Sequence, residues 1–493
     1  MTTAARERPS RSLIWALAES GGLSLISLAV LLIVAHRVGP AELGAFAIAI
    51  GIVQVLSLLV DMLVHDALIQ RPRLSPRHLD TAFWTCAVLG IALCGLCWLA
   101  APAAGALFDS AQVAAILPVA ALSLAFSGFA AVPIAMLRRD QRFRPLALRS
   151  LVGRSCAAIA AVGLVATGAG IWALVVQHVA QVAISACLLW PATAWRPAAR
   201  FSAGRLIELL SFGSLSVGTR LVWLGSARLF VLLVGNLLGV TAVGYINIAQ
   251  RVVDTLFDLL AGAAQNLALP IFSRRQADRA HLVRAYAQAT EFATLAAQPI
   301  FAGLAICAGP LIALLLGDTW LVAAPLVQVL ALGALLQFMV LFGDPVIVSM
   351  GRPGVVFALS LLSFAFVIGG FFVAPPATPL DAMLIWVGRI LLAAPILLAV
   401  LSALLELSPV HILRLTWLPL GATAIMAGVV FGVQGLWLGD RAPLVQLAVM
   451  VPLGIVVYGG AIALLGRHTL LRLVQFVWSG VRPVSLAGTP AAR

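Results

Sequence analysis

Two stretches of the chain decide its fold. The first reads V-G-P-A-E-L-G-A-F over 38–46, and the second reads L-G-V-T-A-V-G-Y-I over 238–246. Gly39 and Gly44 of the first stretch recur as Gly239 and Gly244 in the second. Each stretch separates two long apolar runs, and the later run ends in an arginine-rich segment. The sequence therefore predicts an internal repeat built from apolar segments.

The composition makes lipid the solvent for most of these segments. Of the 493 residues, 62% are hydrophobic and only 10% are charged, and the mean hydropathy is +1.09. A soluble domain carries roughly 25% charged residues. No water-soluble fold hides this much apolar surface, so the chain is predicted to be an integral membrane protein.

A membrane-spanning helix needs about 20 mainly apolar residues. Runs of that kind cover roughly 13–35, 42–64, 82–107, 112–137, 150–168, 171–190, 207–236, 242–271, 286–316, 321–349, 354–374, 381–405, 411–433 and 443–466. The fold class is thus all-α, with about 14 transmembrane helices. The loops between them are too short for a soluble catalytic domain.

The arginines give the expected orientation. With the N-terminus inside, only Arg37 and Arg441 of the 31 basic residues lie on outer loops; a few lie within runs, and all others lie on inner segments. Cytoplasmic loops carry such an excess. Both termini are therefore predicted to face the cytoplasm, in a bacterial cytoplasmic membrane. This spread of charge over short loops also excludes a nucleic-acid partner.

The repeat predicts the domain organisation. Each glycine stretch lies on the outer turn between the first and second helix of a six-helix unit. Because six is even, the units are parallel repeats around a central cavity. We expect an N-terminal six-helix bundle over 1–200 and a C-terminal six-helix bundle over 201–406. Two additional helices over 407–466 and a cytoplasmic tail over 467–493 follow.

Charges within membrane spans are candidate functional groups because they are costly to bury. Arg220 and Arg228 lie two helical turns apart in one predicted span, and Arg251 lies in the next. Together they predict a cationic wall suited to phosphate, since arginine holds its charge and matches phosphate oxygens. Arg154 could instead reach the headgroups, and Arg389 has no evident partner in the sequence.

The embedded acids leave alternatives open. Asp254 and Asp258 share a helix face with Arg251, so Arg251 could be neutralised by internal pairing. Glu19 could bind a proton or sodium, or it could pair with an arginine across the cavity. Glu291 is a further candidate for ion coupling or charge pairing.

Signatures of enzymes and metal sites are not found. The sequence has no phosphate-binding GxxxxGK[ST], no HExxH and no GxSxG motif with a plausible triad. The six cysteines lie within apolar runs without zinc-site spacing. We therefore expect neither enzymatic activity nor a resident cofactor.

Short motifs resemble a transporter family. They include G-P-A-E-L-G-A-F at 39–46, D-A-L-I-Q-R at 66–71, D-T-A-F-W at 80–84, L-P-I-F-S at 269–273 and G-R-P at 351–353. In order and spacing they resemble the oligosaccharide flippases of the multidrug/oligosaccharidyl-lipid/polysaccharide exporter superfamily. Coverage extends from about residue 10 to 370.

The resemblance implies a substrate and a mechanism. Undecaprenyl-diphosphate-linked oligosaccharide would cross the membrane by alternating access, coupled to a proton or sodium gradient, for exopolysaccharide, capsule or lipopolysaccharide synthesis. Membrane lipids, a polysaccharide polymerase and export machinery would be its partners. A lipid II flippase is an alternative with a similar cationic cavity. A drug–cation antiporter is another, although it would need an acid-rich cavity.

Overall fold

The computed structural model describes residues 27–62, 65–71, 74–210, 215–273, 279–439 and 441–466. Every regular element in this part of the chain is a helix. Twelve stretches in it are long and apolar enough to cross a membrane. One of them, 224–262, covers parts of two predicted spans, 207–236 and 242–271, and most of the predicted span 13–35 lies outside the described residues. The total of fourteen stays a prediction.

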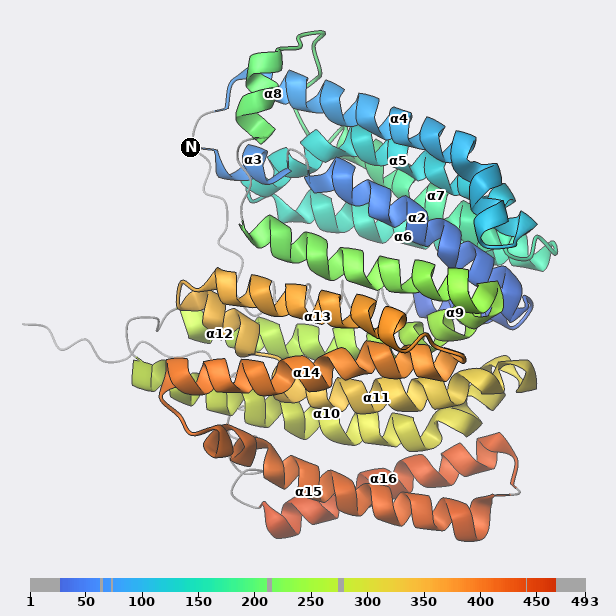
Figure 1. Ribbon diagram of the computed structural model, residues 1–493, viewed down its shortest axis with the longest axis vertical. Coiled ribbons are helices and arrows are strands. Elements are labelled where there is room, and N and C mark those ends of the chain that lie inside the picture. The colour runs from blue at the N-terminus through green and yellow to red at the C-terminus, as the bar shows by residue number, and fades with distance from the viewer. Residues whose placement is uncertain are drawn as a thin grey trace, which may run out of the picture.

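The first group of helices packs at one end of the molecule, blue to green in Figure 1. It comprises α2 (Pro40–Met62), α3 (His65–Gln70), α4 (Pro76–Leu107), α5 (Ala111–Arg139), α6 (Phe143–Ala166) and α7 (Trp172–Leu189). Within it α4 packs on α5, α6 on α7, and α5 on both α2 and α7. The apolar runs predicted between 42 and 190 therefore appear as separate helices.

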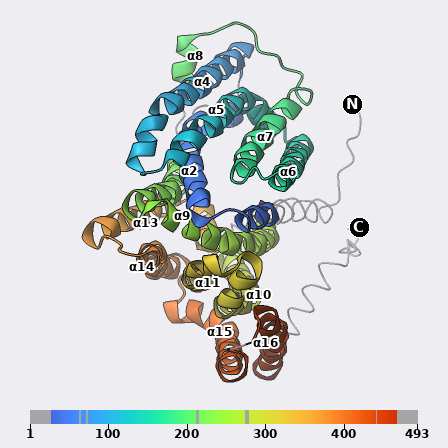
Figure 2. The same cartoon turned by 90° about the vertical axis from the view of Figure 1, so that its right-hand side faces the viewer.

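The second group begins with α9 (Leu215–Ser273), which holds two predicted spans joined at Gly239. Gly239 has φ 82° and ψ 172°, a conformation essentially restricted to glycine. The chain bends there, so the repeat glycine has a conformational reason. Figure 2 shows α9 lying between the first group and α10, α11, α13 and α14.

The rest of the second group and its appendage follow the predicted order. They comprise α10 (Arg279–Leu316), the 3₁₀ helix η1 (Asp318–Ala323), α11 (Ala324–Met339), α12 (Gly343–Ser349), α13 (Pro353–Val373), α14 (Pro379–Leu405), α15 (Pro409–Val433), the π-helical turn η2 (Gln434–Leu438) and α16 (Pro443–Leu465). The predicted span 321–349 corresponds to one of the twelve apolar stretches, Asp318–Ser349, which is divided into η1, α11 and α12. The final pair, α15 and α16, packs on α10 at the far end in Figure 1. The predicted division into two repeats and an appendage stays a prediction.

Local signals explain several helix starts. Thr378 and Asp381 form a capping box at the start of α14, with Thr378 Oγ1 accepting from the Asp381 nitrogen at 3.2 Å. Proline occupies the first turn of α4, α11, α13, α14 and α16, where its missing N–H costs nothing. These caps fix where the apolar runs become helices.

The two repeat stretches touch each other. A methyl group added at Gly44 of α2 would lie 2.7 Å from the carbonyl carbon of Val240 and 2.9 Å from the nitrogen of Gly244. Reciprocally, a methyl group at Gly244 would lie 2.8 Å from the carbonyl carbon of Pro40. Only glycine permits this backbone approach. The equivalent turns of the repeat therefore form a tight seam between α2 and α9.

A short helix ties the chain between the two groups to α4. This helix, α8 (Ala203–Leu210), carries Glu208, which pairs with Arg71 and with Arg205 at 3.0 Å. His78 lies 3.3 Å from the same carboxylate, and its Nδ1 accepts from the Ser75 nitrogen, so its Nε2–H donates to Glu208. The segment that joins the groups is therefore anchored by a polar cluster.

Candidate functional site

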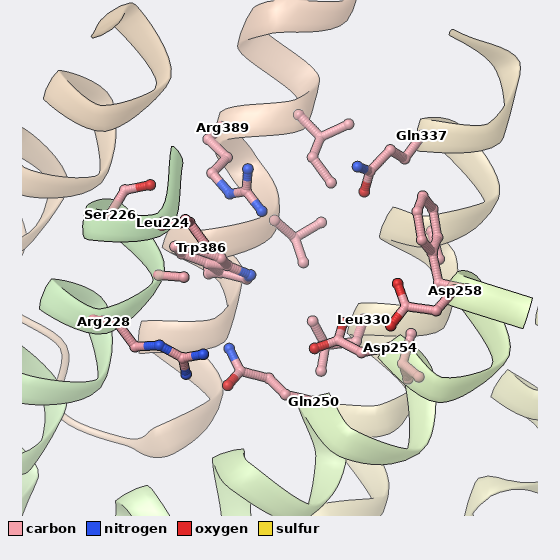
Figure 3. Close-up of a pocket in the computed structure, with 16 residues that line it drawn as sticks. Leu224, Ser226, Arg228, Gln250, Asp254, Asp258, Leu330, Gln337, Trp386 and Arg389 are labelled. Atoms are coloured by element: carbon pink, nitrogen blue, oxygen red, sulfur yellow. The ribbon is translucent and has the colours of Figure 1, made fainter. Parts of the chain in front are cut away.

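A polar pocket lies between α9, α11 and α14. Its volume is about 260 Å³, and residues from both halves of α9 line it, together with Leu330, Ala334 and Gln337 of α11 and Trp386 to Ile390 of α14. Figure 3 shows Arg228 and Arg389 on one side and Asp254 and Asp258 on the other. Fixed cations and anions thus share one space among predicted spans.

These opposite charges are not in direct contact. Among the described residues, no ion pair within 4.0 Å joins Arg228 or Arg389 to Asp254 or Asp258. Asp254 interacts with both arginines at longer range. The two carboxylates are accessible from the pocket, although helices surround them. The separation leaves room for a polar group between the charges.

An aromatic stack positions Arg389. The guanidinium carbon lies 3.9 Å from the ring centroid of Trp386, which itself packs on buried Phe230 with centroids 4.7 Å apart. Phe371 packs edge-on against Phe230, with ring centroids 5.8 Å apart. The guanidinium is held by cation–π stacking, and its buried Nε has no hydrogen-bond partner in the described part of the chain. Arg389 therefore lines the pocket with its orientation set by aromatic packing.

A second cationic pair lies between the two groups of helices. Arg154 of α6 and Arg251 of α9 are close enough for their charges to repel. The buried Nε of Arg154 lacks a hydrogen-bond partner among the residues described. Arg251 also interacts with Asp254 and Asp258 without forming an ion pair within 4.0 Å in this part of the chain. Arg154 therefore adds a cation near Arg251, whereas the sequence indicated only that it could reach the headgroups.

The structure brings together only part of the predicted set. Arg228, Asp254 and Asp258 line the pocket, and Arg251 lies beside the two acids. Glu291 is on α10 and is not among the lining residues. Glu19 and the side chain of Arg220 lie outside the described residues. The roles predicted for all seven residues stay predictions.

Sequence reasoning missed other lining groups. Arg389 had no assigned role, although Trp386 precedes it by three residues and shares its helix face, a signal for stacking. Gln250 and Gln337 add amide groups from two helices, and neither carried a charge that would have drawn notice. In the described ranges, no group of three or more His, Cys, Asp or Glu residues could hold a metal ion.

The fold matches solved transporter structures. The lipid II flippase MurJ, in an inward closed conformation, superposes with a TM-score of 0.75, covering 92% of this chain and 99% of that chain at 14% identity. An inward-facing multidrug resistance MATE family transporter of the MOP superfamily gives 0.60, covering 80% and 99% at 14% identity. The predicted membrane transporter fold is therefore confirmed, and the chain is a multi-pass integral membrane protein.

Curated relatives agree with this fold. The succinoglycan biosynthesis transport protein ExoT of Rhizobium meliloti is 26% identical over 66% of this chain and 65% of its own length. The teichuronic acid biosynthesis protein TuaB of Bacillus subtilis is 23% identical over 61% and 62%. The lipopolysaccharide biosynthesis protein WzxC of Escherichia coli is 23% identical over 66% and 65%. The chain thus spans slightly less than two thirds of the length of these relatives.

The prediction that the chain is not an enzyme agrees with these comparisons. ExoT is described as a transport protein, and the two structural neighbours as a flippase and a transporter. The predicted resemblance to polysaccharide flippases also matches the curated relatives. Finally, the family model for polysaccharide biosynthesis proteins matches residues 33–325, more than half of the chain. The chain therefore belongs to the polysaccharide biosynthesis protein family.

Proposed function

We propose that this protein flips undecaprenyl-diphosphate-linked oligosaccharide from the inner to the outer leaflet of a bacterial cytoplasmic membrane, for exopolysaccharide, capsule or lipopolysaccharide synthesis. The observation that carries the proposal is the pair of arginines, Arg228 and Arg389, with guanidinium groups in a pocket among spans and no ion pair within 4.0 Å to its acids. An arginine fork suits phosphate oxygens. Family membership supplies the saccharide, and the amide groups in the pocket suit sugar hydroxyls.

We assign the driving force to an ion gradient. Asp254 and Asp258 are carboxylates in the same pocket and could carry a proton or sodium while the arginines hold the diphosphate. An ion arriving at these acids would weaken their attraction for the arginines and change the charge of the pocket. A polysaccharide polymerase and export machinery would then consume the flipped substrate.

The test is a flipping assay in proteoliposomes with a fluorescent undecaprenyl-diphosphate-oligosaccharide. Charge-assisted hydrogen bonds contribute roughly 1.5–3 kcal/mol each, so Arg228→Gln and Arg389→Gln should each slow flipping about tenfold or more. Arg37→Gln, an exposed change on the loop before α2, is the matched control and should flip at the wild-type rate. Flipping by both pocket variants at the control rate would remove the pocket from the mechanism.

Two further arms separate the alternatives. Lipid II offered in the same vesicles should flip more slowly than the oligosaccharide lipid, and the reverse would favour a cell-wall role. A cationic dye should not be extruded, because the proposal assigns ligand binding to the two arginines and ion coupling to Asp254 and Asp258. Asp254→Asn should remove the response of the flipping rate to an imposed proton or sodium gradient, and an unchanged response would exclude Asp254 from coupling.

A further inference from the structure

An apolar slot lies where α2 and α9 part. It has a volume of about 380 Å³, and its walls come from Val55 of α2, Phe364 of α13 and the α9 residues Leu221, Val222, Gly225, Leu229 and Leu232. Every lining residue is apolar or glycine. Of the twelve apolar spans, α13 is the least buried, and Leu221 of α9 is 37% exposed. The slot therefore lies at the lipid-facing surface, between the two groups of helices.

The seam between α2 and α9 ends where this slot begins. The helices touch at Gly44 and Gly244, and Ile48 fills the space at Gly235. At Gly51 a methyl group would still contact Leu232 at 3.9 Å. Val55, one turn further along α2, already lines the slot. A tight seam near the outer turn thus opens into an apolar slot further into the membrane.

The depth of the slot suits a chain from the inner leaflet. At 1.5 Å per residue, Leu232 lies about 10 Å and Leu221 about 27 Å from the outer turn at Gly239. The hydrocarbon core is about 30 Å thick. In the predicted orientation, the slot therefore extends from above the bilayer middle toward the inner leaflet.

The slot and the charged pocket lie on neighbouring faces of α9. Leu229 lines the slot, while Arg228, the residue before it, lines the pocket. Consecutive residues lie about 100° apart around a helix. Ser226 and Gly225 repeat this arrangement, with Ser226 in the pocket and Gly225 in the slot. One helix therefore offers a cation and an apolar channel at the same depth.

We infer that this slot binds the polyprenyl chain of the lipid-linked substrate while the diphosphate occupies the arginine pocket. The inference rests on the proposed function for its ligand. Charge complementarity selects this occupant over a bulk phospholipid, because an anionic diphosphate next to Arg228 anchors the start of the chain beside Leu229. The apolar walls of the slot then hold the hydrocarbon chain by van der Waals packing, in place of the surrounding lipid.

The test is photo-crosslinking in nanodiscs with undecaprenyl diphosphate that carries a diazirine on its hydrocarbon chain. We expect label on the peptides that contain Val55, Leu229 and Phe364. Gly225→Leu fills the slot, since a side chain there meets no atom within 4 Å at its Cβ, and should reduce that label about fivefold or more. Gly163→Leu on α6, where the added Cβ also meets nothing, is the control and should label like wild type.

Other outcomes overturn the inference. Label outside the slot, or label unchanged in Gly225→Leu, would exclude the slot as the binding place. Equal labelling by a phospholipid with a diazirine on its acyl chain would make it a bulk lipid contact only. If Gly225→Leu does not fold, Phe364→Trp narrows the slot from α13 and should reduce the label too. If the wild-type protein labels in the slot but does not flip the oligosaccharide lipid, the proposed function is contradicted and the inference about the slot is not.

Discussion

The seam at Gly44 gives the sharpest prediction. Gly44→Ala places a methyl group 2.7 Å from the Val240 carbonyl carbon and 2.9 Å from the Gly244 nitrogen, where carbon atoms normally stay about 3.5–4.0 Å apart. The neighbours are backbone atoms of a packed helix, which have no rotamer to change. The two helices must therefore move apart by about 1 Å or more at this turn, which the predicted orientation places outside the membrane.

The cost can be estimated. Inserting a methylene into a well-packed site costs typically about 1–3 kcal/mol. If only the state with the seam closed bears this cost, the equilibrium between closed and open seam shifts by about 5–150-fold toward the open one. Gly39→Ala is the matched control on the same turn, because a methyl group there meets nothing within 4 Å. In Gly39→Ala the equilibrium between the closed and the open seam should therefore stay unchanged.

The assay is cysteine labelling from outside the membrane. Ala47 lies three residues after Gly44, hence on the same face of α2, and is 7% exposed. In a background without the six native cysteines, Ala47→Cys should react slowly with a membrane-impermeant maleimide, and Gly44→Ala should accelerate it at least fivefold. Gly44→Ala combined with Gly244→Ala should add little, because one opening relieves both clashes.

Three results would refute this reasoning. Labelling of Gly44→Ala at the wild-type rate would mean that the seam absorbs the methyl group without opening. Equal acceleration by Gly39→Ala would mean that the loop, rather than the close approach, governs access. If the labelling rate of the double variant rises by the product of the two single accelerations, the two glycine contacts act independently and do not form one seam.

Further predictions concern Glu208, Gly239 and the stacking of Arg389 on Trp386. Hydrogen bonds from His78 and two arginines lower the pKa of Glu208 to about 2, so they stabilise the fold above about pH 4.5 and that stabilisation is lost as the pH falls toward 2. Glu208→Gln should therefore speed hydrogen exchange over 203–210 at pH 7. Gly239→Ala should lower the Tm, since its φ of 82° costs other residues about 1–3 kcal/mol. Arg389→Lys keeps the charge but loses the planar stacking on Trp386, and flipping should slow by about 2- to 30-fold. Trp386→Leu should slow it similarly.

The sequence predicted the helices well because lipid imposes a length and an apolar pattern that read directly along the chain. The division of the span 321–349 was not predicted, and this has a physical cause. The stretch is apolar enough on average for one span, so hydropathy could not find the break between α11 and α12. The turn at Gly343, whose Cβ position is crowded by Leu397 and Leu401 of α14, depends on tertiary packing.

For the candidate site too, the sequence predicted the local features but not those that depend on tertiary packing. Arg228 and Asp254 were found because charge within an apolar run is a local signal. Their meeting with Arg389 was not predictable, because it depends on how α14 packs on α9. Arg154 shows the limit most clearly: its position near the end of a run suggested solvation by headgroups, and the packing instead brings it near Arg251.

The arrangement of seam, slot and pocket along α9 explains why a flippase would need all three. The backbones of α2 and α9 are in tight contact at Gly44 and Gly244, and the apolar slot at Gly225 lies further along α9. Arg228 lies at the depth of the slot, so a diphosphate could bind there while its chain stays in hydrocarbon. The hydrocarbon then never has to cross a polar cavity, and only the charged and sugar groups need a path through protein. In the proposed function, separation of the two α9 faces would therefore lower the energetic cost of moving an amphiphile across a membrane.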